Sequence, residues 1–120
     1  MKEYNLQKAV CKYLDLNKVL YCASLGGQYQ IFRSQRIKAK ASGYKKGFPD
    51  IFIYESSPCG KYHGLAIELK VGYNKATKEQ LWWCERLNKR AYLAKVCTGI
   101  DETIETINNY FKGKNNANKP

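Results

Sequence analysis

Residues 47–54 read GFPDIFIY and residues 64–71 read GLAIELKV, and each segment has the length and apolar content of a short buried β-strand. Three charged residues nevertheless lie within them, namely Asp50, Glu68 and Lys70. Moving a charged group out of water costs on the order of several kcal/mol unless the group is paired or bound to an ion. The two segments therefore predict neighbouring strands of a central sheet and a functional site carried on them.

The segment GLAIELKV presents two different surfaces, because side chains alternate between the two faces of a strand. The apolar face is expected to enter the core and carries Leu65, Ile67, Leu69 and Val71. Glu68 and Lys70 are neighbours on the other face, together with Ala66. Asp50 opens the preceding strand directly after Pro49. If the two strands pair through the turn between them, Asp50 and Glu68 converge at one end of the sheet.

Two carboxylates that lie close together repel each other, and one of them is driven towards protonation. A divalent cation removes this conflict, and a site with few oxygen ligands from the protein suits Mg²⁺ or Mn²⁺. Lys70 would then lie where its ammonium group can orient a water or neutralise charge in phosphodiester hydrolysis. A structural alternative exists, because Pro-Asp is common at strand entries and an exposed Glu-Leu-Lys ion pair stabilises little. The combination on two apolar strands favours catalysis.

Eight helices and strands are expected, in the order α-β-α-β-β-α-β-α. Helices are predicted over residues 3–17, from a cap at Thr77 to about residue 90, and from a cap at Asp101 onwards, while residues 29–41 form a helix or a partly ordered arm. Strands are predicted at residues 19–24, about 50–54, 63–71 and 91–97. The helices are expected to place these residues on their apolar faces: Leu6, Val10, Tyr13 and Leu14; Leu81, Cys84 and Leu87; Ile104, Ile107 and Phe111. This alternation predicts an α/β fold, a mixed central β-sheet flanked by helices.

The length of 120 residues indicates one domain, which we assign to residues 1–112, followed by a polar tail, GKNNANKP, at 113–120 that is expected to be disordered. Lys and Arg number 21 against 10 Asp and Glu, so the formal net charge is +11. Such an excess suits a polyphosphate partner, although many soluble proteins are basic without binding nucleic acid.

The cysteines show no metal-binding or disulfide pattern. Cys11, Cys22, Cys59, Cys84 and Cys97 include no Cys-x-x-Cys pair, and most have apolar neighbours, so we expect reduced and buried side chains. The sequence shows no signal peptide and no apolar stretch of membrane-spanning length. An intracellular, cytoplasmic protein without a membrane partner is expected.

The pair Pro49-Asp50 followed by Glu68-Leu69-Lys70 resembles the PD-(D/E)xK nuclease signature. The wider arrangement resembles the VRR-NUC (virus-type replication-repair nuclease) family in particular. The matching segments span the chain from Glu3 to about Phe111 and are EYNLQ at 3–7, KASGYKKGFPD at 40–50, YHGLAIELK at 62–70, TKEQ at 77–80 and AYLAKVCTG at 91–99. One departure is Leu25 before Gly26-Gly27, where related proteins often carry a polar residue.

The resemblance implies a restriction-endonuclease-like core and an endonuclease that depends on Mg²⁺ or Mn²⁺. It implies that Asp50, Glu68 and the Leu69 main-chain carbonyl hold the metal and that Lys70 is the catalytic lysine. It also implies active-site positions for Glu3 on the first helix and for Gln80. Each of these two has an alternative role.

The alternative for Glu3 is structural, because an acid in the first turn of a helix is favoured by the helix dipole. The alternative for Gln80 is a capping box with Thr77, in which Gln80 reaches back to the N-cap amide. His63 has no necessary part in a mechanism that relies on a lysine and a metal.

The basic residues before Asp50 are expected to attract a phosphate backbone, and they are Arg33, Arg36, Lys38, Lys40, Lys45 and Lys46. Phosphate contacts carry no base information, so recognition by shape and charge is predicted. Tyr73 and Trp82 or Trp83 are candidates for stacking on nucleobases, with core packing as the alternative.

The resemblance further implies cleavage of branched DNA, such as four-way (Holliday) junctions, by a homodimer. A phage origin, which the family makes plausible, would place the protein in the host cytoplasm. Two alternatives stay open. One is a non-catalytic nucleic-acid-binding module that retains the fold, and the other is a sequence-specific restriction enzyme, for which no additional recognition domain is visible.

Overall fold

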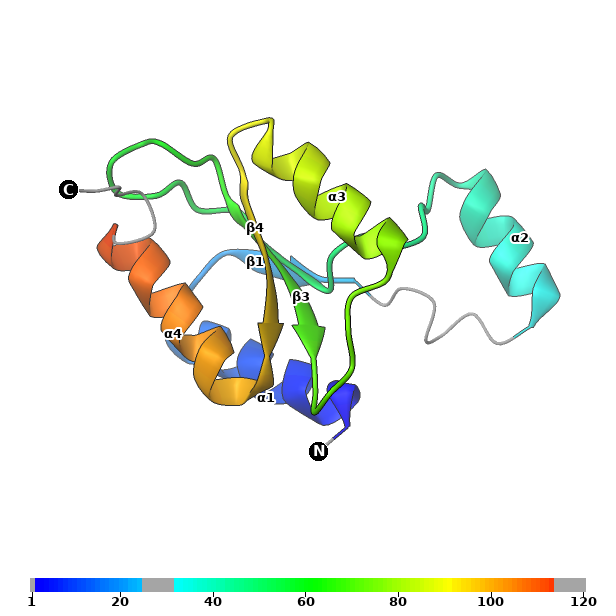
Figure 1. Ribbon diagram of the computed structural model, residues 1–120, viewed down its shortest axis with the longest axis horizontal. Coiled ribbons are helices and arrows are strands. Elements are labelled where there is room, and N and C mark those ends of the chain that lie inside the picture. Colours follow the sequence, from blue (N-terminus) through cyan, green and yellow to red (C-terminus); the bar gives the residue numbers. More distant parts are fainter. Residues whose placement is uncertain (1, 25–31, 114–120) are drawn as a thin grey trace.

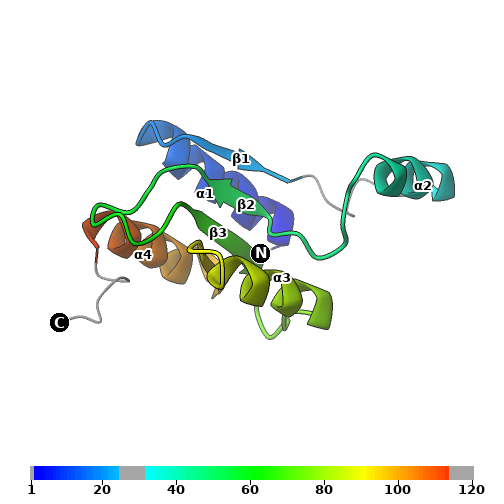
Figure 2. The ribbon, with the colours of Figure 1, turned by 90° about the horizontal axis from the view of Figure 1, so that it is seen from above.

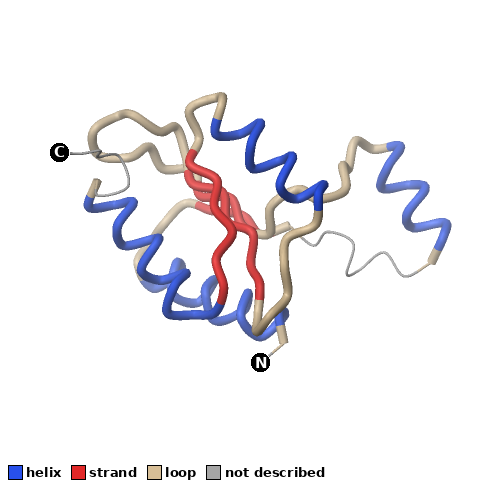
Figure 3. Tube along the Cα trace, in the orientation of Figure 1, coloured by secondary structure: helices blue, strands red, loops and turns tan. Residues whose placement is uncertain are grey.

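Helices and strands follow one another in the predicted order in the computed structural model, which describes residues 2–24 and 32–113 (Figures 1 and 3). The elements are α1 (Glu3–Leu16), β1 (Tyr21–Ala23), α2 (Arg33–Ala41), β2 (Ile51–Ile53), β3 (Leu65–Lys70), α3 (Lys78–Asn88), β4 (Leu93–Thr98) and α4 (Gly99–Lys112). The predicted tail after Gly113, Leu25 to Gly27, and the first part of the predicted 29–41 segment lie outside the described residues.

The four strands form one mixed sheet in the order β1-β2-β3-β4. β1 pairs antiparallel with β2, and β2 pairs antiparallel with β3. β3 pairs in parallel with β4, and α3 is the crossover between these two strands. Helices α1 and α4 contact each other and cover one face, while α3 covers the other (Figures 1 and 2). The predicted α/β fold with a mixed, helix-flanked sheet is confirmed.

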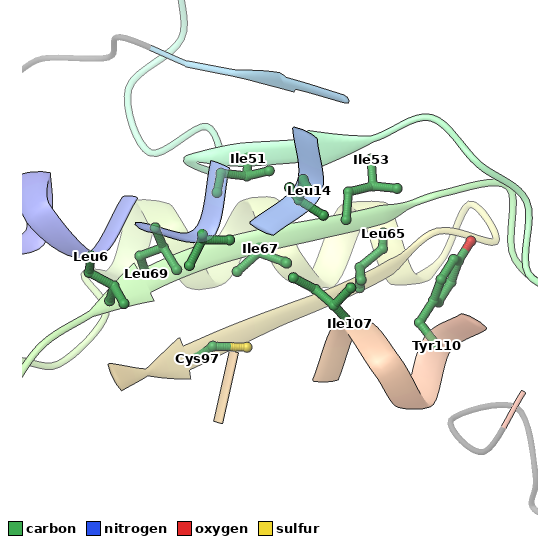
Figure 4. Close-up of a cluster of buried hydrophobic side chains, with 11 residues drawn as sticks. Leu6, Leu14, Ile51, Ile53, Leu65, Ile67, Leu69, Cys97, Ile107 and Tyr110 are labelled. Atoms are coloured by element: carbon green, nitrogen blue, oxygen red, sulfur yellow. The ribbon is translucent and has the colours of Figure 1, made fainter. Parts of the chain in front are cut away.

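All six residues of β3 are buried, because helices cover both faces of this inner strand. Leu65, Ile67 and Leu69 enter a cluster with the apolar faces of α1 and α4 (Figure 4). Ala66 enters a second cluster beneath α3. The predicted alternation of β3 is therefore correct, but its second face is an interior surface rather than an exposed one.

The buried faces of α3 and α4 differ from the predicted ones by a rotation about the helix axis. Leu81, predicted to be buried, is 53% exposed, because α3 packs on the sheet through Cys84 and Leu87. In α4, Ile107 is buried as predicted, but Ile104 and Phe111 are only half-buried.

Helix α4 also starts earlier than predicted, with Thr98 rather than Asp101 at its N-cap. Thr103, Thr106 and Tyr110 occupy its buried face. The Thr103 hydroxyl donates a hydrogen bond to the Gly99 carbonyl at 2.7 Å, so this polar group is paired inside the core. Apolar periodicity does not detect threonines of this kind.

The five cysteines are free, as predicted, but only two of them are buried. Cys84 and Cys97 lie in the two cores, and Cys11 is half-buried. Cys22 and Cys59 are exposed, so the prediction of burial is wrong for them. Cys22 lies on edge strand β1 and Cys59 in the β2–β3 loop, where apolar neighbours in the sequence do not ensure cover by another element. Across residues 2–24 and 32–113, no helix combines the length and the apolar character needed to span a membrane.

The burial of β3 predicts a large loss of stability for Ile67→Ala. Ile67 is 0% exposed, and truncation of such a residue costs about 2–5 kcal/mol of unfolding free energy. Leu81→Ala is the matched control, since exposed substitutions change stability by about 0.5 kcal/mol or less. Urea denaturation followed by circular dichroism measures both. Equal losses for the two variants would contradict the assignment of the core.

Candidate active site

The register of β2 and β3 positions Asp50 against Glu68. Ile51 pairs with Ile67 at the last position of this ladder. Continuing the register by one residue places Asp50 opposite Glu68, and residues opposite each other in antiparallel strands point to the same face. The two side chains are close enough that each carboxyl shifts the pKa of the other. The convergence predicted from the two sequence segments is present.

The main chain of Leu69 lies on the Asp50 side of β3. Its N–H donates a hydrogen bond to Asp50 Oδ2 at 2.8 Å. In an antiparallel ladder the N–H and C=O of one residue point to the same neighbouring strand, so the Leu69 carbonyl also points to this side. The register places Pro49 opposite Leu69, and proline has no N–H to donate. Pro49 thus leaves the Leu69 carbonyl without its ladder donor, close to Asp50.

Glu68 is 2% exposed, and its Oε1 atom has no hydrogen-bond donor among the described residues. Burial, and then the neighbouring Asp50 carboxylate, raise the pKa of Glu68 to about 9. Burial also raises the pKa of Asp50, and the hydrogen bond from the Leu69 N–H opposes that rise. A buried carboxylate oxygen without a hydrogen-bond partner destabilises the fold, and a cation bound beside Glu68 Oε1 would remove this cost.

A divalent cation fits this carboxylate pair. The described residues contain no group of three or more His, Cys, Asp or Glu side chains that could hold a metal. Mg²⁺ commonly binds through one or two carboxylates and keeps several waters, so two acids are sufficient for it. The partnerless oxygen of Glu68 beside Asp50 therefore suits a Mg²⁺-like ion better than Zn²⁺, which favours a closed set of N and S ligands.

Lys70 lies next to this pair and is 7% exposed. Its Nζ atom is 3.8 Å from Glu68 Oε2 and 3.9 Å from Glu3 Oε2. Glu3 belongs to the first turn of α1, which lies beside the C-terminal end of β3 (Figure 1). The structure thus brings Glu3 to Lys70 while Glu3 also occupies the helix position that favours an acid.

Gln80 forms the capping box of α3. The Thr77 hydroxyl accepts a hydrogen bond from the Gln80 N–H at 3.2 Å, and Gln80 Oε1 accepts one from the Thr77 N–H at 2.9 Å. Cys84, one turn further along α3, faces the sheet near Glu68. Of the two roles considered for Gln80, capping is therefore present, and any role at the site would fall to its Nε2 group.

A basic groove of about 860 Å³ lies between α2 and the N-terminal end of α3. Four of the predicted phosphate-binding residues line it, namely Arg36, Lys40, Lys45 and Lys46. Arg33 and Lys38 lie on α2 but are not among its lining residues. Lys78, which the sequence analysis did not select, completes the set of cations. The sequence offered one indication of a role for Lys78, its position in the TKEQ segment.

The loop before Asp50 is held directly against α3. Gly47 has a φ of +90°, and a Cβ atom there would lie 2.7 Å from the main-chain carbon of Glu79. Trp83 Nε1 donates a hydrogen bond to the Lys46 carbonyl at 3.1 Å. These contacts connect the groove to the loop that ends in Asp50, directly before β2. His63, by contrast, precedes β3 at the end opposite Lys70 and packs against Tyr92.

A four-stranded mixed sheet with helices on both faces and paired acids on neighbouring strands is consistent with a restriction-endonuclease-like fold. One solved structure, described as a "VRR_NUC domain protein", is 31% identical to this chain with a TM-score of 0.78. The alignment covers 93% of this chain and 89% of that one. This chain belongs to the VRR_NUC domain family. No family model and no curated protein sequence matches it.

The raised pKa of Glu68 predicts how the stability of the metal-free protein depends on pH. The folded-state pKa of about 9 lies above the ordinary value of 4.5, so neutral Glu68 stabilises the fold fully below pH 4.5. This contribution is lost as the pH rises towards 9. In EDTA, we expect the urea midpoint of the wild type to fall over this range and that of Glu68→Gln to fall less.

Glu105→Gln is the matched control, because Glu105 is exposed on α4. It should follow the wild-type pH profile. A Glu68→Gln profile parallel to that of the wild type would show that Glu68 is charged in the folded apoprotein throughout this range.

Proposed function

We propose that this protein is a nuclease that hydrolyses DNA phosphodiester bonds with Mg²⁺ or Mn²⁺. The observation that carries the proposal is the pair of half-buried Asp50 and buried Glu68, in which Glu68 Oε1 has no donor among the described residues. A binding module has no need for an acid pair of this kind. The membership of the VRR_NUC domain family supports the same conclusion.

Three groups would hold the metal: the carboxylates of Asp50 and Glu68 and the main-chain carbonyl of Leu69. A metal bound there supplies a Lewis acid for the phosphoryl oxygen and lowers the pKa of a coordinated water. Asp50 has a second task, because its hydrogen bond to the Leu69 N–H fixes the end of β3. The Leu69 side chain in the core holds the same segment from the opposite face.

Lys70 supplies the positive charge of the site. The carboxylates of Glu68 and Glu3 lie on either side of its ammonium group and hold it at the end of β3. A cation held in place near a scissile phosphate stabilises the negative charge that grows in the transition state. The same ammonium group can orient the attacking water. Glu3 is a positioning residue in this scheme, because it acts on the site through its contact with the Lys70 ammonium group.

The basic groove would hold the phosphate backbone of the substrate. Lys45 and Lys46 precede Asp50 in the loop that rests on α3, so a strand bound to them passes close to the acid pair. Phosphate contacts do not read bases, which leaves recognition to shape and charge.

We extend the proposal to branched DNA, including four-way junctions, cut by a homodimer. The support is the resemblance to VRR-NUC nucleases and the small size of one domain. Two copies would bring two sets of Asp50, Glu68 and Lys70 to one junction. A cytoplasmic location accords with a DNA substrate of this kind.

Replacement of Lys70 tests the catalytic assignment. Loss of one charge-stabilising group from an active site lowers kcat by about 10²–10³-fold, and we expect Lys70→Ala to do so. Lys75→Ala is the matched control, because Lys75 is exposed in the β3–α3 loop. The assay uses end-labelled four-way junction, flap and linear duplex with Mg²⁺, Mn²⁺ or EDTA. Cutting in EDTA, or undiminished cutting by Lys70→Ala, would refute the mechanism. Binding without any cutting would identify the non-catalytic module.

Replacement of Asp50 tests metal binding without a cleavage readout. Saturating Mn²⁺ should raise the melting temperature of the wild type, since a ligand at 100 times its Kd stabilises a fold by about 2.7 kcal/mol. Asp50→Asn keeps an oxygen for the Leu69 N–H but removes the charge, so its melting temperature should respond little to Mn²⁺. Asp101→Asn, at an exposed position of α4, should respond like the wild type. An equal response of Asp50→Asn and the wild type would place the metal elsewhere.

A further inference from the structure

The basic groove has a composition that the acid pair does not explain. Its cations are Arg36, Lys40, Lys45, Lys46 and Lys78, against one carboxylate, Glu79. Its volume of about 860 Å³ falls within the range of about 300–1,000 Å³ that is common for ligand sites. The remaining lining residues are aromatic: Tyr44, Trp82 and Trp83. A surface that only attracted duplex phosphates would not require indole rings.

Trp82 is the exposed aromatic of this groove, with 49% of its surface accessible. Trp83 packs against it edge to face, with ring centroids 5.7 Å apart. The Arg86 guanidinium lies 4.9 Å from the ring centroid of Trp82 and is not part of the groove lining. Two neighbours therefore hold the Trp82 ring while it lines the groove.

Trp83 has a structural role by comparison. Its Nε1 donates a hydrogen bond to the Lys46 carbonyl, and its ring packs edge to face on Phe48. It thereby joins the loop before Asp50 to α3. Trp82 makes no corresponding contribution to the core, because α3 packs on the sheet through Cys84 and Leu87. Beside Trp83 and Arg86, 49% of the surface of Trp82 stays accessible for a ligand.

A fixed, exposed aromatic ring within a cationic groove suits a single nucleic-acid strand, since bases stack on the ring while cations contact the phosphates. A base inside a duplex has both faces covered by its neighbours and cannot stack on a side chain. We propose that this groove binds an unpaired DNA strand, with one base stacked on Trp82 and its phosphates near Lys40, Lys45 and Lys78. This inference rests on the proposed nuclease function and adds to it that an unpaired strand of the branched substrate enters this groove.

The test compares single-stranded and duplex binding in EDTA, where metal-dependent cleavage is absent. Fluorescence anisotropy is measured with labelled oligo-dT and with a blunt duplex of the same length. Trp82→Ala should weaken the affinity for the single strand by about 5- to 140-fold, the range for loss of one stacked base. Its affinity for the duplex should change by less than about twofold, because stacking plays no part there.

Two further variants separate stacking from a general disturbance of α3. Trp82→Phe keeps an aromatic ring and should recover part of the single-strand affinity. Leu81→Ala is the matched control, because Leu81 is similarly exposed on the same helix but does not line the groove. It should bind both probes like the wild type. A Trp82→Ala variant that binds like Leu81→Ala, or that loses both probes equally, would overturn the inference. Unaltered DNA binding together with lost capture of an acidic peptide would identify a protein ligand instead and would also overturn it.

A failure of this inference can be distinguished from a failure of the nuclease proposal. Cleavage that requires Lys70, together with unselective DNA binding by Trp82→Ala, would sustain the nuclease and refute the stacking site. Selective loss of single-strand binding in Trp82→Ala, with no DNA cleavage by the wild type in either metal, would sustain the stacking site and refute the nuclease.

Discussion

Two carboxyl groups held side by side, one buried on β3 and one half-buried at the entry to β2, are the constraint around which this protein is organised. Asp50 and Glu68 face each other across β2 and β3, and Glu68 Oε1 has no donor in the described part of the chain. Their position depends on register, because a slip of one residue would move each side chain to the other face of the sheet. Successive side chains of β3 pack alternately against α1 and α4 and against α3, and this packing opposes a slip. The core thus holds the two carboxyl groups close together, although their ionised forms repel each other.

The rest of the site is assembled around this pair from separate layers. Helix α1 brings Glu3 to Lys70 from one side of the sheet, and α3 covers the Glu68 face from the other. The capping box of Thr77 and Gln80 sets where α3 begins, and Gly47 allows the basic loop to lie on that end. Helix α2 buries none of its residues. Two of its cations, Arg36 and Lys40, line the groove beside α3.

Much of this arrangement could be predicted, and the errors have a common physical origin. The order of the elements and the meeting of Asp50 with Glu68 followed from strand periodicity and from the short turn between β2 and β3. The burial of Leu81, Ile104 and Phe111 was overestimated, because small rotations of a helix move residues between its inner face and its flank. Thr103 was missed because its hydroxyl is paired within its own helix. Two cysteines were misplaced because apolar neighbours in sequence do not ensure cover in space.

The amino-acid order was sufficient to locate the acid pair and Lys70, since a period of two residues determines which strand side chains share a face. It was also sufficient to indicate a basic protein of the family to which this chain belongs. It left two alternative roles open for each of Glu3, Gln80 and the tryptophans. The contacts of Glu3 with Lys70 and of Trp83 with Lys46 arise only from packing, because they join segments far apart in the chain. Such contacts depend on how the helices pack on the sheet, which a local sequence pattern does not determine.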